Sequence, residues 1–275
     1  MSNCKVIALT NQKGGVGKTT TAVNLGVSLV QQGKKVLLID ADAQANLTMA
    51  LGYNRPDDIP ITLSTVMQNI IDDKTLDVSQ GIIHRREGVD LLPSNIELSG
   101  FEVRLINAMS RERVLKTYVN EVKKNYDYVL IDCMPSLGMI TINALAAADS
   151  VIIPTQPHYL SAKGLELLLR SVSMVKRQIN PKLRIDGILM TMVMPRTNIS
   201  KEITATVKSA YGKKIKVFDT EIPHSIRAVE ATAEGKSIFA YDKSGKVAAA
   251  YEQLGKEVAE IGEKQRNQNR ADRIR

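Results

Sequence analysis

The fold of this chain is decided by residues 11–20, which read NQKGGVGKTT. The apolar run at residues 4–9 precedes this stretch and predicts a buried strand, and residues 21–30 follow it with the spacing of a helix. A strand, a glycine-rich loop and a helix in this order are typical of a loop that binds phosphate. The glycines let the backbone turn its N–H groups inward, beside the positive end of the helix dipole. We therefore predict a site for a polyphosphate.

Individual positions of this loop have predicted roles. Lys18 is expected to reach the outer phosphates, and the hydroxyl of Thr19 is expected to hold Mg²⁺. The nucleotide-binding set of the loop comprises Lys13, Gly14, Gly15, Val16, Gly17, Lys18, Thr19 and Thr20. The ordinary motif has a glycine five positions before Gly17, but Gln12 stands there and a second lysine, Lys13, follows it. The loop is therefore a variant of the ordinary phosphate-binding motif.

This variant loop, K-G-G-x-G-K-T, resembles the Walker A loop of the ParA/MinD family, and residues 11–20 resemble the ParA/Soj branch of that family. Three further segments are similar to motifs of the family. Residues 40–46 resemble its switch segment, residues 132–138 its Walker B element with the following turn, and residues 221–227 its I-P-[RH]-x-x-x-[LR] segment. The resemblance covers nearly the whole chain. It implies an ATPase whose cofactors are ATP and Mg²⁺.

The resemblance also implies a metal site at the ends of two predicted strands, residues 35–40 and 126–132. Thr19, Asp40 and Asp132 are the implied residues of the magnesium site, and Asp132 would act through a water. An aspartate that ends a strand can instead cap the helix that follows, which is the alternative for Asp40.

Catalysis in the resembled family depends on positioning and on charge. Phosphoryl transfer needs little covalent help, so a P-loop ATPase mainly orients a water and neutralises the phosphates. The resemblance implies that Asp42 and Asn46 orient the water and that Lys18 contacts the phosphates. It further implies an ATP-dependent homodimer in which Lys13 of one subunit reaches the phosphates bound by the other. Pro223 is expected to line the adenine pocket.

The chain departs from the family pattern at four positions in these segments. Ala43 replaces a proline in the switch segment, and Met134 replaces the first proline after Asp132. In P-x-Q-x-E-Y-Y, His158 replaces the acid and Leu160 replaces the second tyrosine. The segment around His158 borders the dimer face in relatives, so we expect partner contacts that differ there. The first two departures alter local turn geometry but remove no functional group.

Positive charge is concentrated in the second part of the chain. The net charge is +8; residues 170–275 hold 21 Lys and Arg against 12 Asp and Glu, whereas residues 1–169 hold 16 against 17. Such an uneven charge attracts polyanions, although a merely basic surface is the alternative. The resemblance implies that Arg196 and Arg227 bind DNA, and Lys201 could extend the phosphate contacts. No aromatic set is interleaved with these residues, so binding to double-stranded DNA should be nonspecific.

Strands that alternate with helices predict an α/β fold with a doubly wound, mostly parallel sheet flanked by helices. Residues 1–262 are expected to form a single P-loop ATPase domain. A last helix at residues 247–261 then precedes a charged, flexible tail at residues 263–275. The sequence has no apolar run near the ~20 residues that span a bilayer and no signal peptide. We expect a cytoplasmic, nucleoid-associated protein.

The resemblance implies a DNA-partitioning ATPase stimulated by a ParB-like centromere-binding protein, and three alternatives stay open. A MinD-like positioning ATPase would need an amphipathic membrane helix, but residues 263–270 have no apolar face. An electron-transfer relative such as the nitrogenase iron protein would need paired cysteines that Cys4 and Cys133 do not resemble. A regulatory module that binds a partner without useful turnover is the third alternative. The sequence does not identify the cargo.

Overall fold

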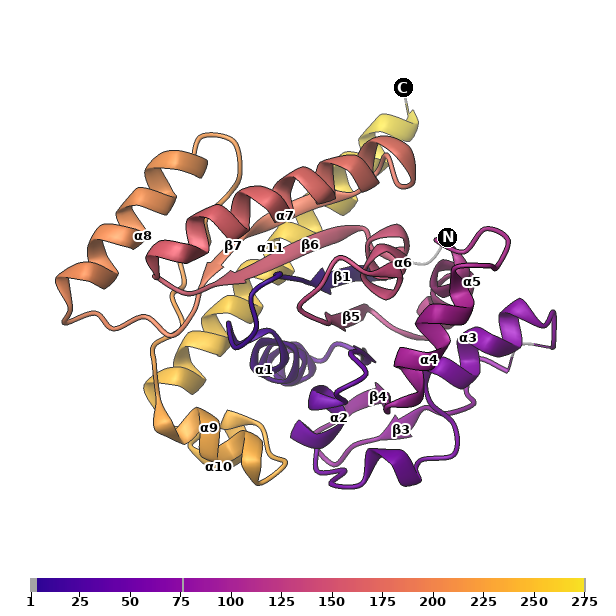
Figure 1. Ribbon diagram of the computed structural model, residues 1–275. Coiled ribbons are helices and arrows are strands. Elements are labelled where there is room, and N and C mark those ends of the chain that lie inside the picture. Colours follow the sequence, from indigo (N-terminus) through magenta and orange to yellow (C-terminus); the bar gives the residue numbers. More distant parts are fainter. Residues whose placement is uncertain (1–3, 76, 275) are drawn as a thin grey trace.

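A central sheet of seven strands organises the structure (Figure 1). The structure is a computed structural model that describes residues 4–75 and 77–274; the side chains of residues 159–163 and 269–274 are not described. The strands are β1 (Lys5–Leu9), β2 (Val36–Ala41), β3 (Ile83–His84), β4 (Val89–Leu92), β5 (Tyr128–Cys133), β6 (Ser150–Thr155) and β7 (Arg184–Met190). Their order across the sheet is β3-β4-β2-β5-β1-β6-β7, and neighbouring strands are parallel except β3 with β4. The prediction of a doubly wound, mostly parallel sheet is confirmed.

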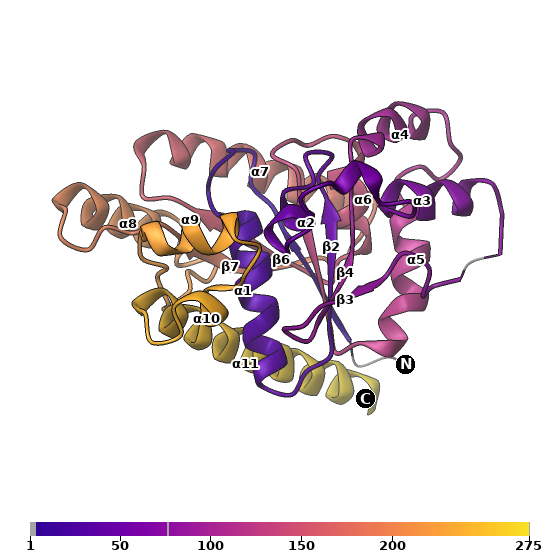
Figure 2. The ribbon, with the colours of Figure 1, turned by 90° about the horizontal axis from the view of Figure 1, so that it is seen from below.

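Helices cover both faces of the sheet, which explains why β1, β2, β5 and β6 are buried along their whole length. One face packs against α1 (Lys18–Gln31), α2 (Asn46–Ala50), α9 (Ile226–Ala233), α10 (Ile238–Tyr241) and α11 (Lys246–Ile274). The other packs against α3 (Leu63–Ile71), α4 (Glu97–Leu105), α5 (Val114–Val122), α6 (Met139–Ala147), α7 (Tyr159–Gln178) and α8 (Asn198–Tyr211). Short 3-10 helices form at Pro56–Asp58 and Lys123–Asn125. Figure 2 shows α1 and α11 on the opposite side of the sheet from α3 and α5.

Helix α11 is longer than its apolar spacing predicts. The spacing predicts an end at Ile261, whereas the helix runs to Ile274, so this prediction is wrong. Beyond Ile261 the helix is held by a polar contact with β7, in which the Gln265 amide donates to Asp186 Oδ1 at 2.9 Å. Asp186 is also held by Lys5 at 2.6 Å, and both of these side chains are buried. The flexibility expected of the tail stays a prediction.

Two glycines bring the turns after α2 and α9 into direct backbone contact. Gly52 has a φ of +88° and Gly235 a φ of +66°, a region that side chains disfavour. A Cβ added to Gly235 would lie 2.4 Å from the Cα of Gly52, so a larger residue would require the backbone to move. Nearby, Asn24 Oδ1 in α1 accepts from the N–H of Ile238 in α10 at 2.8 Å. Helices α9 and α10 are thereby fixed to the elements that follow β1 and β2.

Candidate functional site

The register of the parallel strands gathers predicted site residues at the carboxyl edge of the sheet. Asp40 in β2 lies directly opposite Asp132 of β5, and Asp132 lies opposite Leu9 of β1. The chain leaves the sheet after Leu9, forms the glycine loop and enters α1 at Lys18. Two carboxylates, the loop and a helix N-terminus therefore meet at the edge where ligands bind in parallel sheets.

The glycine loop, residues 11–17, is an open cradle on a fixed base. Gly15 has a φ of +69° and Gly17 a φ of +81°, so both positions favour glycine. Gly14 and Gly15 are exposed, and a Cβ on either would meet nothing within 4 Å. The base is held by the hydroxyl of Thr191, which donates to the Val16 carbonyl at 2.8 Å. The outer surface of the loop is thus free to receive a ligand.

Thr19 and Asp132 are joined in an arrangement that suits a metal. The hydroxyl of Thr19 donates to Asp132 Oδ2 at 2.6 Å. The other oxygen, Oδ1, is buried and has no hydrogen-bond partner in the described part of the chain. Burial raises the pKa of Asp132 to about 7, because a charged carboxylate is costly without a counter-charge. An unpartnered buried oxygen beside a hydroxyl fits Mg²⁺, which prefers oxygen ligands.

Asp40 lies opposite this pair, but its oxygens are already engaged. Oδ2 accepts from the N–H and the hydroxyl of Thr48, at 2.8 and 2.7 Å, and Oδ1 accepts from the Asp42 N–H at 3.2 Å. Burial, followed by the charge of Asp132, raises the pKa of Asp40. Because Thr48 lies in the first turn of α2, these bonds support the capping alternative for Asp40. Its metal role stays a prediction.

The other residues with predicted catalytic roles lie at or beside this edge. Lys18 is buried, which lowers its pKa, and its Nζ donates to the Lys13 carbonyl at 3.4 Å, so the side chain folds back over the loop. Asp42 is buried, and its Oδ1 accepts from the Gln44 N–H at 3.0 Å. Asn46 is exposed at the start of α2. Their catalytic roles stay predictions.

The raised pKa of Asp132 predicts a stability change with pH. The folded chain holds a proton on this carboxyl up to about pH 7, whereas the unfolded chain releases it near 3.8. Stability therefore falls as the pH rises through this window. We expect Asp132→Asn, without nucleotide, to be more stable than the original chain by about 1–3 kcal/mol at pH 8 and nearly equal at pH 4. Urea unfolding at both pH values measures this, and a less stable variant at pH 8 would contradict it.

Gln156 is a site residue to which the sequence analysis assigns no role. It directly follows β6, and its Nε2 donates to the Gly15 carbonyl at 2.8 Å. Its Oε1 accepts from the Nζ of Lys13 at 3.4 Å. Two signals were available in the sequence: Gln156 stands at the glutamine of the P-x-Q-x-E-Y-Y segment, and it comes just after the carboxyl end of a buried strand.

Pro223 lies at the same edge, beyond β7. It forms a parallel bridge with Val193, whose N–H donates to the Ile222 carbonyl at 3.0 Å. Met192, next to Val193, approaches the glycine loop, because a Cβ on Gly17 would lie 3.7 Å from its Cε. One short segment after β7 therefore contacts both the loop and the Pro223 region. The adenine contact expected of Pro223 stays a prediction.

The residues with predicted DNA contacts are exposed. Arg196 and Lys201 flank the N-terminus of α8. Arg227 lies in the first turn of α9, where its guanidinium pairs with Asp242 at 3.3 Å while 64% of its side chain stays exposed. The bridge beyond β7 brings together the segments that lead into α8 and α9. The three basic residues are thus attached, through this bridge, to the segment that contacts the glycine loop.

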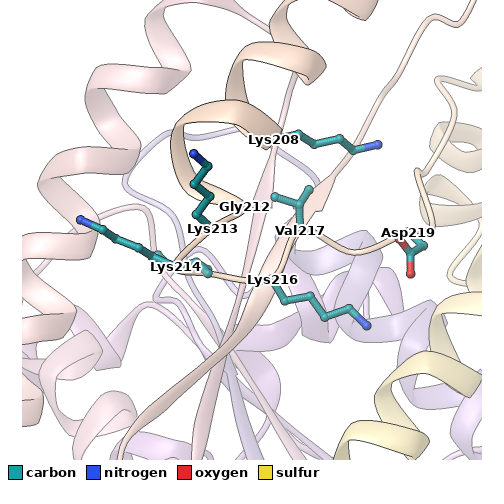
Figure 3. A pocket seen from close by; sticks show the side chains of 8 residues that line it. Lys208, Gly212, Lys213, Lys214, Lys216, Val217 and Asp219 are labelled. Carbon is teal, nitrogen blue, oxygen red and sulfur yellow. The ribbon is translucent and has the colours of Figure 1, made fainter.

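Further lysines surround an open cavity of about 640 Å³ at the end of α8 (Figure 3). The residues that line it are Lys208, Gly212, Lys213, Lys214, Ile215, Lys216, Val217 and Asp219. Figure 3 shows the lysine side chains pointing in different directions. Lys208 pairs with Glu221 at 3.0 Å, and Lys216 pairs with Glu257 at 3.4 Å. The cavity is therefore a spread basic surface and does not converge on one anion.

Comparisons with known proteins agree with this geometry. Residues 4–185 match the family model described as "AAA domain". The chain is 44% identical over 259 residues to the sporulation initiation inhibitor protein Soj of Bacillus subtilis, covering 94% of this chain and 99% of that protein. It is 38% identical to the chromosome partitioning protein ParA of Caulobacter vibrioides, covering 92% and 93%. A crystal structure of cobyrinic acid a,c-diamide synthase from Mycobacterium smegmatis with an ATP analogue and magnesium gives a TM-score of 0.81 at 35% identity, covering 92% and 93%.

Proposed function

This chain belongs to the ParA/Soj family of chromosome-partitioning ATPases, and we propose that it is an ATP-dependent switch for DNA partitioning. ATP drives a homodimer, the dimer binds DNA nonspecifically, and hydrolysis stimulated by a ParB-like centromere-binding protein reverses both steps. The observation that carries the proposal is the segment after β7, which contacts the glycine loop through the hydrogen bond from Thr191 to Val16 and pairs with Pro223. Basic residues that could contact DNA are thereby linked to the nucleotide loop.

The glycine loop and the Thr19–Asp132 pair form the proposed ATP and magnesium site. Thr19 and Asp132 are the residues that would hold Mg²⁺ there, Asp132 through a water, and the unpartnered Oδ1 of Asp132 supports this assignment. Bound Mg²⁺ supplies positive charge that stabilises the phosphates during transfer. Lys18 places its ammonium group over the loop, and Asp42 orients the attacking water together with Asn46. Positioning and charge are what this reaction requires of a protein.

The proposed dimer forms face to face across the glycine loops. Gly14 and Gly15 are exposed, so a second subunit can approach the phosphates closely. Lys13 is half-buried beside them and crosses to the partner's phosphates, where its charge stabilises the transition state as an arginine finger does in other P-loop enzymes. Two basic surfaces are then joined, and the doubled phosphate contacts raise the affinity for DNA.

The DNA contacts can be tested with Arg227→Ala. We expect the variant to bind random-sequence duplex more weakly in the presence of ATP and Mg²⁺, with the slope of log affinity against log salt reduced by about 2 per dimer, since each subunit loses one phosphate contact. Fluorescence anisotropy across a salt series, with no nucleotide, ADP or ATP, measures both quantities. Lys256→Ala is the control, because Lys256 is an exposed lysine of α11 that pairs with Glu252 at 2.7 Å.

Binding that does not depend on the nucleotide, or no DNA binding in any state, would contradict the proposal. The function would then move toward positioning on a protein or a membrane, and sedimentation with liposomes and ATP is the measurement that tests the membrane alternative. Throughout residues 4–75 and 77–274, no helix is both long enough and apolar enough to cross a bilayer.

A further inference from the structure

The side chain of Gln156 connects the glycine loop to Lys13. Its Nε2 donates to the Gly15 carbonyl at 2.8 Å, and its Oε1 accepts from Lys13 Nζ at 3.4 Å. The amide therefore lies between the exposed turn of the loop and the ammonium group proposed to act on a second subunit. Gln156 lies just beyond the carboxyl end of β6, 141 residues from Gly15 and 143 residues from Lys13 in the chain.

The chemistry of this position requires a residue that donates on one side and accepts on the other. The Gly15 carbonyl can only accept, and the Lys13 ammonium can only donate. A glutamine amide meets both needs in one orientation. Glutamate would hold Lys13 more strongly but place an acceptor against the Gly15 carbonyl, and leucine would make neither bond.

The backbone of Lys13 is fixed independently of this contact. Its N–H donates to Asn11 Oδ1 at 3.0 Å, and Asn11 Nδ2 donates to the Pro154 carbonyl at 2.7 Å. Since Asn11 and Pro154 hold the main chain, a change in the reach of Lys13 must come from its side-chain rotamers. The bond to Gln156 selects one of these rotamers, in which the ammonium stays on its own subunit.

We propose that Gln156 is a positioning residue that retains Lys13 on its own loop until an ATP-bound partner replaces it. The inference rests on the proposed function, in which Lys13 crosses the dimer face. Each subunit must break one Lys13–Gln156 bond before the dimer closes, so the contact opposes dimerisation twice. The retained state keeps the lysine from the phosphates of its own subunit and limits pairing when ATP is absent.

The test uses two substitutions with opposite expected effects. Gln156→Leu releases Lys13, so at saturating ATP and Mg²⁺ the dimer should form at about tenfold lower protein concentration. Gln156→Glu retains Lys13 more strongly, so the protein concentration at which half of the chains are dimeric should be about tenfold higher than for the original chain. Analytical ultracentrifugation measures both midpoints. If Gln156 only holds the loop at Gly15, both variants should dimerise more weakly than the original chain. Midpoint concentrations that shift in the same direction in the two variants would overturn the proposal.

A second measurement does not depend on the dimer. In the nucleotide-free chain, Gln156→Leu should increase the rate at which acetic anhydride modifies Lys13, read by peptide mass spectrometry with the exposed Lys35 as internal reference. An unchanged rate overturns the proposal. If Lys13→Ala leaves the dimer intact, the proposed function fails. If Lys13→Ala abolishes the dimer as expected but Gln156→Leu does not change the labelling of Lys13, only the proposed role of Gln156 fails. In the Lys13→Ala background, Gln156→Leu should have no further effect on association.

Discussion

Asp42→Ala is expected to hydrolyse ATP about 10²–10³-fold more slowly than the original chain while binding ATP and DNA normally. The backbone of Asp42 is tied to Asp40 at 3.2 Å, so its carboxylate has a defined place at the carboxyl edge of the sheet. Because the residue lies outside the glycine loop, its loss removes the group that orients water but no phosphate contact. Phosphate release under single-turnover conditions, with ATP affinity measured in parallel, separates the two effects.

The matched control for this variant is Asp58→Ala. Asp58 is an exposed carboxylate in the 3-10 helix after α2, where it pairs with Arg55 at 3.5 Å. Its removal takes the same charge from the same part of the chain and should leave turnover within about twofold, since exposed ion pairs contribute little. Normal turnover in Asp42→Ala would refute the water-positioning role.

Lys13→Ala is expected to abolish the ATP-dependent dimer and to lower stimulated hydrolysis by at least about 10²-fold, because the phosphates lose a cation supplied from across the interface. ATP binding should be largely retained. Lys18 and the loop backbone still contact the phosphates, and the backbone bond from position 13 to Asn11 does not depend on the lysine side chain. Size-exclusion chromatography with light scattering, with and without ATP, measures the dimer.

Lys35→Ala serves as the control for this loss of charge. Lys35 is exposed and lies just before β2, at the end of the sheet away from the glycine loop, so its removal should change neither association nor turnover. An undiminished dimer in Lys13→Ala would remove the basis for a lysine acting between subunits.

Sequence patterns predicted the central part of this fold because its signals are local. Strands β1 and β2 each contain four consecutive apolar residues, and the glycine loop carries its own conformational requirements at Gly15 and Gly17. Once strands and helices alternate, the positions of Asp40 and Asp132 follow, because parallel strands end at one edge. In the structure, Asp40 and Asp132 accordingly lie opposite each other on neighbouring strands.

The features that were not predicted have weak local signals. Helix α9 buries only Ala231 among its described side chains, while Ile226 and Val229 are 70% and 65% exposed, so its large apolar residues do not mark a buried face. Helix α2 has five residues, too few to show a helical period. The role of Gln156 depends on contacts with residues far away in the sequence, which spacing alone does not reveal. The extension of α11 likewise depends on a polar contact with β7.

The contact between Gly52 and Gly235 has a mechanical consequence. Side chains between two packed elements can change rotamer and absorb a small displacement, whereas backbone atoms in contact cannot. The junction between α2 and α9 therefore has almost no compliance in the direction of the contact. A shift of α2 toward α9 must therefore displace the turn at Gly235, which follows α9. The position of α9, the helix that carries Arg227, therefore depends on the position of the segment that begins at Asp42.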